Sequence, residues 1–309
     1  MDYCDIAVIK SLCKQHGLYP SSIRGQNFLI SRDVLDDMVE TADLKKDNII
    51  LEVGPGFGTL TLELAKRVKK VIAVEQDKIL IKALQENLKK ENINNVEIIE
   101  GNVLRINSYS HSERSEESQR KRSFATLRMT LNEDYRIVSN LPYQITSHFL
   151  RQFLEAESKP QDMTIMVQKE VAERICAKPG QMSLLAVSVQ FYAKPEIVRV
   201  VSKDCFWPEP KVDSAIIKIA LSSRKNKERA EFDEKYFFKI VRNGFLHRRQ
   251  KLVNNLSNAF RLDKKNLESA LKRMGISENA RAQELSMNQW IDLTKEILKL
   301  KGDKLRLTE

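Results

Sequence analysis

The chain is 309 residues long and has a net charge of +10, because 52 Lys and Arg outnumber 42 Asp and Glu. This length allows a large and a small domain, and the basic balance suits a partner made of phosphates without identifying one. There is no apolar run near the roughly 20 residues of a membrane span, no signal peptide pattern and no C-x-x-C pair, so we expect a soluble, cytoplasmic protein without a membrane partner, zinc ribbon or redox dithiol.

The first part of the chain alternates predicted strands with predicted helices. Residues 1–26 read as a helix followed by a basic, turn-rich arm, and Ser31 precedes a second helical pattern. Further strands are predicted at 48–54, 71–75, 96–101, 135–139 and 163–168, with helices at 59–70 and about 77–91. This rhythm is typical of a parallel, doubly wound α/β sheet.

Two later stretches break the rhythm. Residues 109–130 are crowded with Ser, Arg and Glu, and we interpret them as a segment added between the third and fourth strands. Charged amphipathic helices then follow at 232–243, 248–260, 265–274 and 287–300. The sequence therefore predicts an N-terminal domain at 1–223, with the inserted segment, and a small all-helical C-terminal domain at 224–309.

A glycine-rich turn follows the strand at 48–54. Gly54, Gly56 and Gly58 allow the backbone to turn tightly and to approach a ligand, although the same pattern can be a mere strand-to-helix corner. Glu75 ends the next strand, 21 residues after Gly54, where a carboxylate can accept both hydroxyls of a ribose. Together these features favour a site for a nucleoside cofactor.

The spacing of the glycines distinguishes between two candidate cofactors. Gly-x-Gly-x-Gly is not the Gly-x-Gly-x-x-Gly of dinucleotide sites, and Glu52 adds negative charge where a diphosphate would be repelled. A cationic cofactor without phosphate, S-adenosylmethionine, therefore fits better than NAD. Asn102, after the third strand, is placed to read an adenine edge, but Asn is also a common turn residue.

Asn140-Leu-Pro-Tyr ends the fourth strand. Because the carboxyl ends of parallel strands meet at one crevice, Asn140 and Tyr143 should face the cofactor. The exocyclic amine of adenine is a poor nucleophile, and the Asn140 amide oxygen and the Leu141 carbonyl can accept its two N–H bonds while Tyr143 stacks on the base. Pro142 fixes the turn and exposes that carbonyl. A purely structural Asn-Pro turn is the alternative.

Several segments in the same order resemble the ribosomal RNA adenine dimethyltransferases, most closely those that act on small-subunit 16S rRNA. The segments are Gly25-Gln-Asn-Phe-Leu, Glu52-Val-Gly-Pro-Gly-Phe-Gly, Val74-Glu-Gln-Asp, Asn140-Leu-Pro-Tyr, Phe206-Trp-Pro-Glu-Pro-Lys-Val-Asp-Ser-Ala, Phe245-Leu-His-Arg-Arg-Gln-Lys and Arg281-Ala-Gln-Glu-Leu-Ser. The resemblance implies a Rossmann-like class I S-adenosylmethionine-dependent methyltransferase sheet with a small helical C-terminal domain.

The resemblance also assigns residues. It implies a cofactor site made by Asn27, Leu29, Gly54, Gly56, Glu75, Asn102 and Asn140. The family usually has aspartate at the position of Asn102, so cofactor affinity is expected to be lower here. Catalytic roles fall to Asn140, Leu141, Pro142, Tyr143 and Phe206, with Phe206 sandwiching the target base opposite Tyr143.

Contact with RNA phosphates is expected from Lys211, Arg248, Arg249 and Lys251, although basic runs are often simply solvated. The implied substrate is 16S rRNA in the small subunit or its precursor, methylated by a monomer at two adjacent adenosines during subunit biogenesis. Three alternatives remain: a large-subunit rRNA methyltransferase of the macrolide-resistance type, a DNA adenine methyltransferase, and a ribosome-assembly factor without catalysis. The long helical C-terminal domain and the run from Phe206 to Ala215 count against the first, a second proline or an acid in the Asn140 motif would be more usual for the second, and the last is raised by Asn102 and the insertion.

Overall fold

The computed structural model describes residues 1–20, 25–105, 134–221 and 233–306, and the predicted insertion at 109–130 lies outside them. The chain divides into two compact units. The first comprises Met1–Ala172 and Pro195–Leu221, and the second comprises Glu173–Lys194 and Ser222–Glu309. This division differs from the predicted boundary at 223, because the apolar helix α8 (Leu184–Tyr192) packs against helices of the C-terminal unit. Phe191 of α8 stacks on Phe237 there, with 4.4 Å between the ring centroids.

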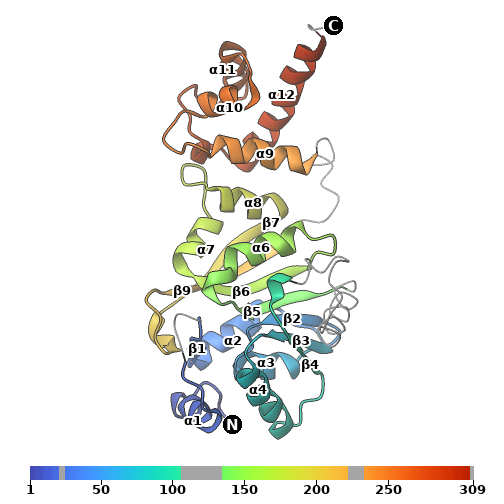
Figure 1. Cartoon of the computed structure of the whole chain (residues 1–309), viewed down its shortest axis with the longest axis vertical. Coiled ribbons are helices and arrows are strands. Elements are labelled where there is room, and N and C mark those ends of the chain that lie inside the picture. Colours follow the sequence, from blue (N-terminus) through green and yellow to red (C-terminus); the bar gives the residue numbers. More distant parts are fainter. Residues whose placement is uncertain (21–24, 106–133, 222–232, 307–309) are drawn as a thin grey trace, which may run out of the picture. The chain divides into compact units, whose positions relative to one another are not determined.

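In its described residues the first unit is built on a seven-stranded sheet, which Figure 1 shows with its helices. In spatial order its strands are β4 (Val96–Glu100), β3 (Lys70–Glu75), β2 (Ile49–Val53), β5 (Arg136–Asn140), β6 (Asp162–Gln168), β9 (Ser214–Leu221) and β7 (Ala193–Val201). The five strands from β4 to β6 are parallel, which confirms the predicted doubly wound sheet. β9 runs antiparallel to β6. The sequence patterns did not reveal β9 and β7: β9 begins at the end of a stretch interpreted only as a motif, and β7 contains Pro195 and charged side chains.

The helices of the first unit are α1 (Ile6–His16), α2 (Arg32–Thr41), α3 (Thr59–Ala65), α4 (Lys78–Lys90), α6 (Thr146–Glu155) and α7 (Lys169–Ile175), the last of which crosses the unit boundary. Some of these helices begin or end at local capping signals, although Ser31 makes no side-chain capping bond to α2. Asp77 caps α4 by accepting a hydrogen bond from the Ile79 N–H at 2.9 Å. Glycine at 17 ends α1 in the left-handed conformation.

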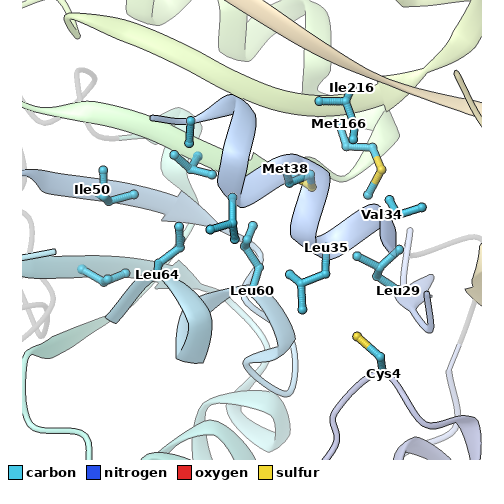
Figure 2. Packing of buried hydrophobic residues seen from close by; sticks show 14 of the residues in the cluster. Cys4, Leu29, Val34, Leu35, Met38, Ile50, Leu60, Leu64, Met166 and Ile216 are labelled. Atoms are coloured by element: carbon cyan, nitrogen blue, oxygen red, sulfur yellow. The ribbon is translucent and has the colours of Figure 1, made fainter. Parts of the chain in front are cut away.

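A hydrophobic cluster forms around α2 (Figure 2). Val34, Leu35 and Met38 are spaced at i, i+1 and i+4, so they share one helix face, and none is more than 1% exposed. The same cluster contains Leu60 of α3 and Met166 of β6. Burial of each such side chain contributes about 1.5–3 kcal/mol to folding, which fixes α2 on the sheet.

The second unit is helical in its described C-terminal part. Its helices there are α9 (Glu234–Gly244), α10 (Leu252–Phe260), α11 (Lys264–Arg273) and α12 (Met287–Arg306). Trp290 is fully buried and stacks on Phe245, with ring centroids 5.6 Å apart. Across the described ranges, no helix combines the length and the apolar character needed to cross a bilayer.

The helix predicted at 248–260 begins later, at Leu252. The buried Asn255 explains the difference, because its side-chain Nδ2 donates to the carbonyls of Gly244 at 2.7 Å and His247 at 3.2 Å. These bonds hold residues 245–251 as a turn, so Arg248 and Arg249 lie on a turn rather than on a helix face.

Candidate active site

The site forms where β2 and β5 separate. β2 pairs with β3 along its length, whereas its ladder to β5 joins Ile50 to Arg136 and Leu51 to Ile137. Beyond that point the buried Ser139 side chain bridges the strands, donating to the Val53 carbonyl at 2.7 Å and accepting from its N–H at 3.3 Å. Such a switch point leaves a crevice at the carboxyl ends of the strands.

A cavity of about 520 Å³ occupies this crevice. Its walls contain every residue that the sequence assigned to the cofactor and three further residues of the Asn-Leu-Pro-Tyr segment: Asn27, Leu29, Gly54, Gly56, Glu75, Asn102, Asn140, Leu141, Pro142 and Tyr143. The structure thus brings together segments that are widely separated in the chain. Met38 and Leu60 of the hydrophobic cluster also line the cavity, so the core supports one wall.

The glycine turn is crowded on two sides. Gly54 has φ 70°, and a Cβ there would lie 3.3 Å from Pro142 Cγ. Gly56 has φ 59°, and a Cβ there would lie 3.2 Å from the Phe28 ring. Both positions need glycine because a side chain would be strained and would push into the cavity walls.

The arm at residues 25–29 closes another side of the cavity. The Gln26 side chain donates to Asp77 Oδ2 at 3.2 Å, and Phe28 lies against Phe57 with ring centroids 4.8 Å apart. β1 (Phe28–Leu29) pairs with β8 (Phe206–Trp207) in a separate two-stranded sheet. Asn27 Oδ1 is buried and has no hydrogen-bond partner among the described residues.

Glu75 stands at the end of β3, as predicted. Its Oε1 accepts the N–H groups of Gln76 at 2.8 Å and Asp77 at 3.0 Å, which fixes the carboxylate at the cavity wall. The residue is 8% exposed. Burial raises the pKa of Glu75, and these N–H bonds oppose that rise.

Glu52 is a second acid on the same wall, and the structure corrects the role that the sequence suggested for it. It is 2% exposed, and burial, reinforced by the charge of Glu75, raises its pKa to about 8. At neutral pH and without a ligand, Glu52 is therefore mainly a neutral carboxylic acid rather than a fixed negative charge. Its Oε2 has no hydrogen-bond partner within the described part of the chain.

Asn102 follows β4 and opens the short 3-10 helix at Val103–Arg105. Its Oδ1 accepts the Leu104 N–H at 2.9 Å, the geometry of an Asx turn. Asn102 is thus both a turn residue and part of the cavity wall. Because its oxygen already accepts one bond, an adenine amine would have to share it.

The Asn-Leu-Pro-Tyr segment is held rigidly. The Leu141 N–H donates to the Met166 carbonyl at 3.1 Å, and the Ile145 N–H donates to the Pro142 carbonyl at 3.2 Å. The Tyr143 hydroxyl is 2.7 Å from the Ser214 hydroxyl, which is fully buried. Burial raises the pKa of Tyr143, so its ring stays a neutral phenol at physiological pH. Sequence reasoning gave Ser214 no role, although it belongs to the proline-rich motif that includes Phe206.

Phe206 does not lie opposite Tyr143 in this structure. The sequence placed it opposite Tyr143, but it is 2% exposed, packs in the hydrophobic cluster and is absent from the described cavity wall. The reason is its pairing in β8 with Leu29, which turns the ring into the core. The neighbouring Trp207 is more exposed, and the Lys10 ammonium lies 5.6 Å from its ring centroid.

The predicted RNA-contacting side chains are all exposed. Lys211 precedes β9 in the first unit, and Arg248, Arg249 and Lys251 lie on the turn before α10 in the second unit. Exposure is compatible with phosphate contact and equally with solvation. Their RNA contacts stay a prediction.

The chemistry of the wall fits a cationic nucleoside. Unpartnered acceptors at Asn27 and Glu52 call for hydrogen-bond donors or positive charge, and Glu75 suits a ribose. Among the described residues that line the cavity, none is Lys, Arg or His, so a diphosphate would find no side-chain cation. The described ranges also hold no cluster of three His, Cys, Asp or Glu side chains suited to a metal ion.

Comparison with known proteins is consistent with this geometry. The family model described as ribosomal RNA adenine dimethylase matches residues 22–299. A Ribosomal RNA small subunit methyltransferase A from Dehalococcoides mccartyi is 42% identical over 285 residues, covering 92% of this chain and 91% of that protein. The protein of the same name from Clostridium botulinum is 39% identical over 269 residues, covering 86% and 90%.

Two solved structures share the fold. The 23S rRNA methyltransferase ErmE superposes with a TM-score of 0.66 at 27% identity, covering 88% of this chain and 99% of that one. A dimethyladenosine transferase from Plasmodium falciparum gives a TM-score of 0.69 at 23% identity, covering 88% and 98%. Both matches extend well beyond the sheet of the first unit.

Proposed function

The chain belongs to the ribosomal RNA adenine dimethylase family, and from this premise we propose how its residues carry out the reaction. The enzyme transfers methyl groups from S-adenosylmethionine to the N6 amines of two adjacent adenosines in 16S rRNA, giving N6,N6-dimethyladenosine. The relatives at 39–42% identity that are named for the small subunit support this substrate. The observation that carries the assignment of residues is a single cavity that joins Glu75, the glycine turn and Asn140 to Tyr143.

At one end of the cavity, the wall residues are proposed to match the polar groups of S-adenosylmethionine. S-adenosylmethionine supplies a methyl group activated by a sulfonium charge. Glu75 is prealigned by two backbone N–H groups to accept the ribose hydroxyls, and Asn27 offers a buried oxygen to a donor. Gly54 and Gly56 leave room for the backbone to approach, and Asn102 lies where it can contact the adenine ring.

The other end of the cavity is proposed to hold the target base. The Asn140 amide oxygen and the Leu141 carbonyl accept the two N–H bonds of the adenine amine, which favours a pyramidal nitrogen with an available lone pair. Tyr143 stacks on the base, and its bond to Ser214 keeps the ring in place. The methylated amine is cationic and loses its proton readily, so the chemistry needs no strong base.

We assign RNA binding to exposed cations, Lys211 on one unit and Arg248, Arg249 and Lys251 on the other. Their phosphate contacts would give affinity and salt dependence without reading the sequence. The cavity lined by this chain already contains Glu75, Asn140 and Tyr143, so the proposed reaction needs no residue from a second copy and the enzyme is proposed to act as a monomer. The substrate is ribosomal RNA, which in turn supports a cytoplasmic site of action and a role in small-subunit biogenesis.

The comparisons favour this function over its alternatives. ErmE, a large-subunit enzyme, is 27% identical, well below the small-subunit relatives. An assembly factor without catalysis would not need the ordered acceptors and the clamped Tyr143 seen in the cavity.

The test is methylation with labelled S-adenosylmethionine of purified immature small subunits and, in parallel, immature large subunits, followed by nucleoside analysis. We expect N6,N6-dimethyladenosine in 16S rRNA and none in 23S rRNA. Label confined to 23S rRNA would transfer the assignment to the large-subunit class. Cofactor binding without any methylation of either subunit would favour the inert assembly factor.

A further inference from the structure

Glu52 is a buried acid in the cavity to which the reaction above assigns no role. It lies on β2 directly before the glycine turn, is 2% exposed and lines the cavity wall. Its Oε2 is among the buried oxygens that have no hydrogen-bond partner in the described chain. A buried carboxyl oxygen without a partner is costly, and more so when it carries charge, so ionisation of Glu52 is penalised unless a countercharge lies close to it.

The surroundings of Glu52 contain no positive side chain to balance its charge. Within the described residues, the charged group that affects the pKa of Glu52 is Glu75 at the end of β3, which raises it. The negative charge of Asp77 in turn raises the pKa of Glu75. The Thr61 hydroxyl of α3 lowers the pKa of Glu52 and so opposes part of the effect of burial, and the wall residues contributed by α2 and β5, Met38 and Asn140, are uncharged. Charge on Glu52 therefore has to be balanced by something that enters the cavity.

We propose that Glu52 is the proton-linked counter-charge of this site: it is neutral in the empty cavity, releases its proton when the sulfonium cofactor binds, and thereby selects the methyl donor over its thioether product. The proposal rests on the proposed function, because it takes S-adenosylmethionine as the ligand. The proton passes from the carboxyl group to solvent, and no covalent bond of the cofactor changes.

The selection follows from net charge. The donor carries a sulfonium, an ammonium and a carboxylate, whereas the product S-adenosylhomocysteine has lost the sulfonium charge with the methyl group. In a water-poor cavity one extra positive charge stabilises a carboxylate strongly. The donor therefore drives Glu52 to ionise, and the product does so less, so the carboxylate favours exchange of product for donor after each transfer.

The sign of the pH dependence is fixed by the same scheme. Burial raises the pKa of Glu52 to about 8 in the empty protein, so below that pH the donor has to displace a proton. Donor affinity should then rise by up to roughly tenfold per pH unit and level off above about pH 8. Product affinity should change less, so the ratio of donor affinity to product affinity rises over the same interval.

Isothermal titration calorimetry of the full chain at pH 7, in buffers of different ionisation enthalpy, counts the protons released on binding. The cofactor's own α-amino group titrates near pH 8, so the parent is compared with Glu52→Gln rather than judged alone. We expect the parent to release up to roughly one more proton than Glu52→Gln with S-adenosylmethionine, and clearly less extra with S-adenosylhomocysteine.

Two further variants complete the design. Glu52→Asp keeps a titratable acid and should retain proton release even if Glu52→Gln folds poorly. Glu97→Gln is the control, because Glu97 lies on β4 outside the described cavity wall, where its carboxylate is 2.6 Å from the Lys70 ammonium. This variant should behave like the parent. Equal proton release by the parent and Glu52→Gln overturns the proposal, as does equal extra release with donor and product. Failure of the parent to bind S-adenosylmethionine would instead overturn the proposed function.

Discussion

At the scale of single residues, Glu52 marks a conflict between folding and function. The unfolded carboxyl has a pKa near 4.5, whereas in the folded protein burial raises the pKa to about 8. Between these values the folded state holds a proton that the unfolded state has released, so the free energy of unfolding falls as pH rises through this window. Glu52 therefore lowers the free energy of unfolding at neutral pH, and its proposed role in cofactor binding explains why an acid occupies this position.

Glu52→Gln should therefore stabilise the protein in a pH-dependent way. The free energy of unfolding should match the parent near pH 4.5, exceed it increasingly up to about pH 8 and level off there with a gain on the order of a few kcal/mol. Urea unfolding at several pH values, with Glu97→Gln as control, measures the effect. A gain that is the same at every pH would show that Glu52 does not titrate in this window.

Asn102 offers a gain of function. Asn102→Asp keeps an oxygen for the Leu104 N–H and adds a charged oxygen for the adenine amine. We expect S-adenosylmethionine to bind about 3- to 10-fold more tightly, measured by calorimetry, because a charge-assisted hydrogen bond contributes roughly 1 kcal/mol more than a neutral one. Unchanged or weaker binding would mean that this position acts only as a turn.

At the scale of elements, the turn between β2 and α3 shapes the cavity. Gly54 has φ 70° and lies against Pro142, while Gly17, at the end of α1, has φ 62° and would leave a Cβ with no other atom within 4 Å. The two glycines therefore share a backbone conformation and differ in their surroundings.

Alanine at each of these glycines should separate strain from contact. Gly54→Ala and Gly17→Ala should each lower the free energy of unfolding by about 1–2 kcal/mol, because both place a side chain in the left-handed region. Only Gly54→Ala should also weaken cofactor binding, by tenfold or more, since its Cβ presses on Pro142. Thermal unfolding and calorimetry give the two readouts, and equal cofactor affinity in both variants would contradict this explanation of the turn.

Periodicity and turn chemistry predicted the elements that carry local signals. The five parallel strands followed from apolar runs, and the placement of Glu75, Asn102, Asn140 and Tyr143 followed because parallel strands end at one edge. Placement that depends on distant partners was not predictable. Phe206 is turned into the core by pairing with Leu29, α8 joins the C-terminal unit through Phe237, and Arg248 lies on a turn set by Asn255.

The ionisation state of Glu52 likewise could not be predicted from the sequence. A sequence shows a carboxyl group beside a glycine turn, but its ionisation depends on burial and on Glu75, which is brought close by the pairing of β2 with β3. The conclusion drawn from the sequence, a cofactor without phosphate, agrees with the wall that the structure describes, although the reason differs.

At the scale of the whole molecule, the net charge of +10 is expected to act through specific exposed cations. Replacing both Arg248 and Arg249 with alanine should weaken binding to 16S rRNA and reduce the slope of log affinity against log salt by up to roughly two, since each arginine would neutralise one phosphate. Cofactor affinity should not change. Filter binding over a range of salt concentrations measures the slope, with Lys264→Ala and Lys265→Ala of α11 together as a control of equal charge. An equal effect in the control would show that only net charge matters.

The central claim is that Asn140 presents the adenine amine in the cavity that holds S-adenosylmethionine. The most direct measurement is nucleoside analysis of 16S rRNA from immature small subunits treated with the parent chain or with Asn140→Ala, with RNA binding verified for both. The parent should produce N6,N6-dimethyladenosine, and the variant should lose at least about 100-fold in rate, the scale of removing an aligned hydrogen-bond acceptor in a reaction that depends on positioning. Abundant dimethyladenosine from Asn140→Ala would contradict this claim.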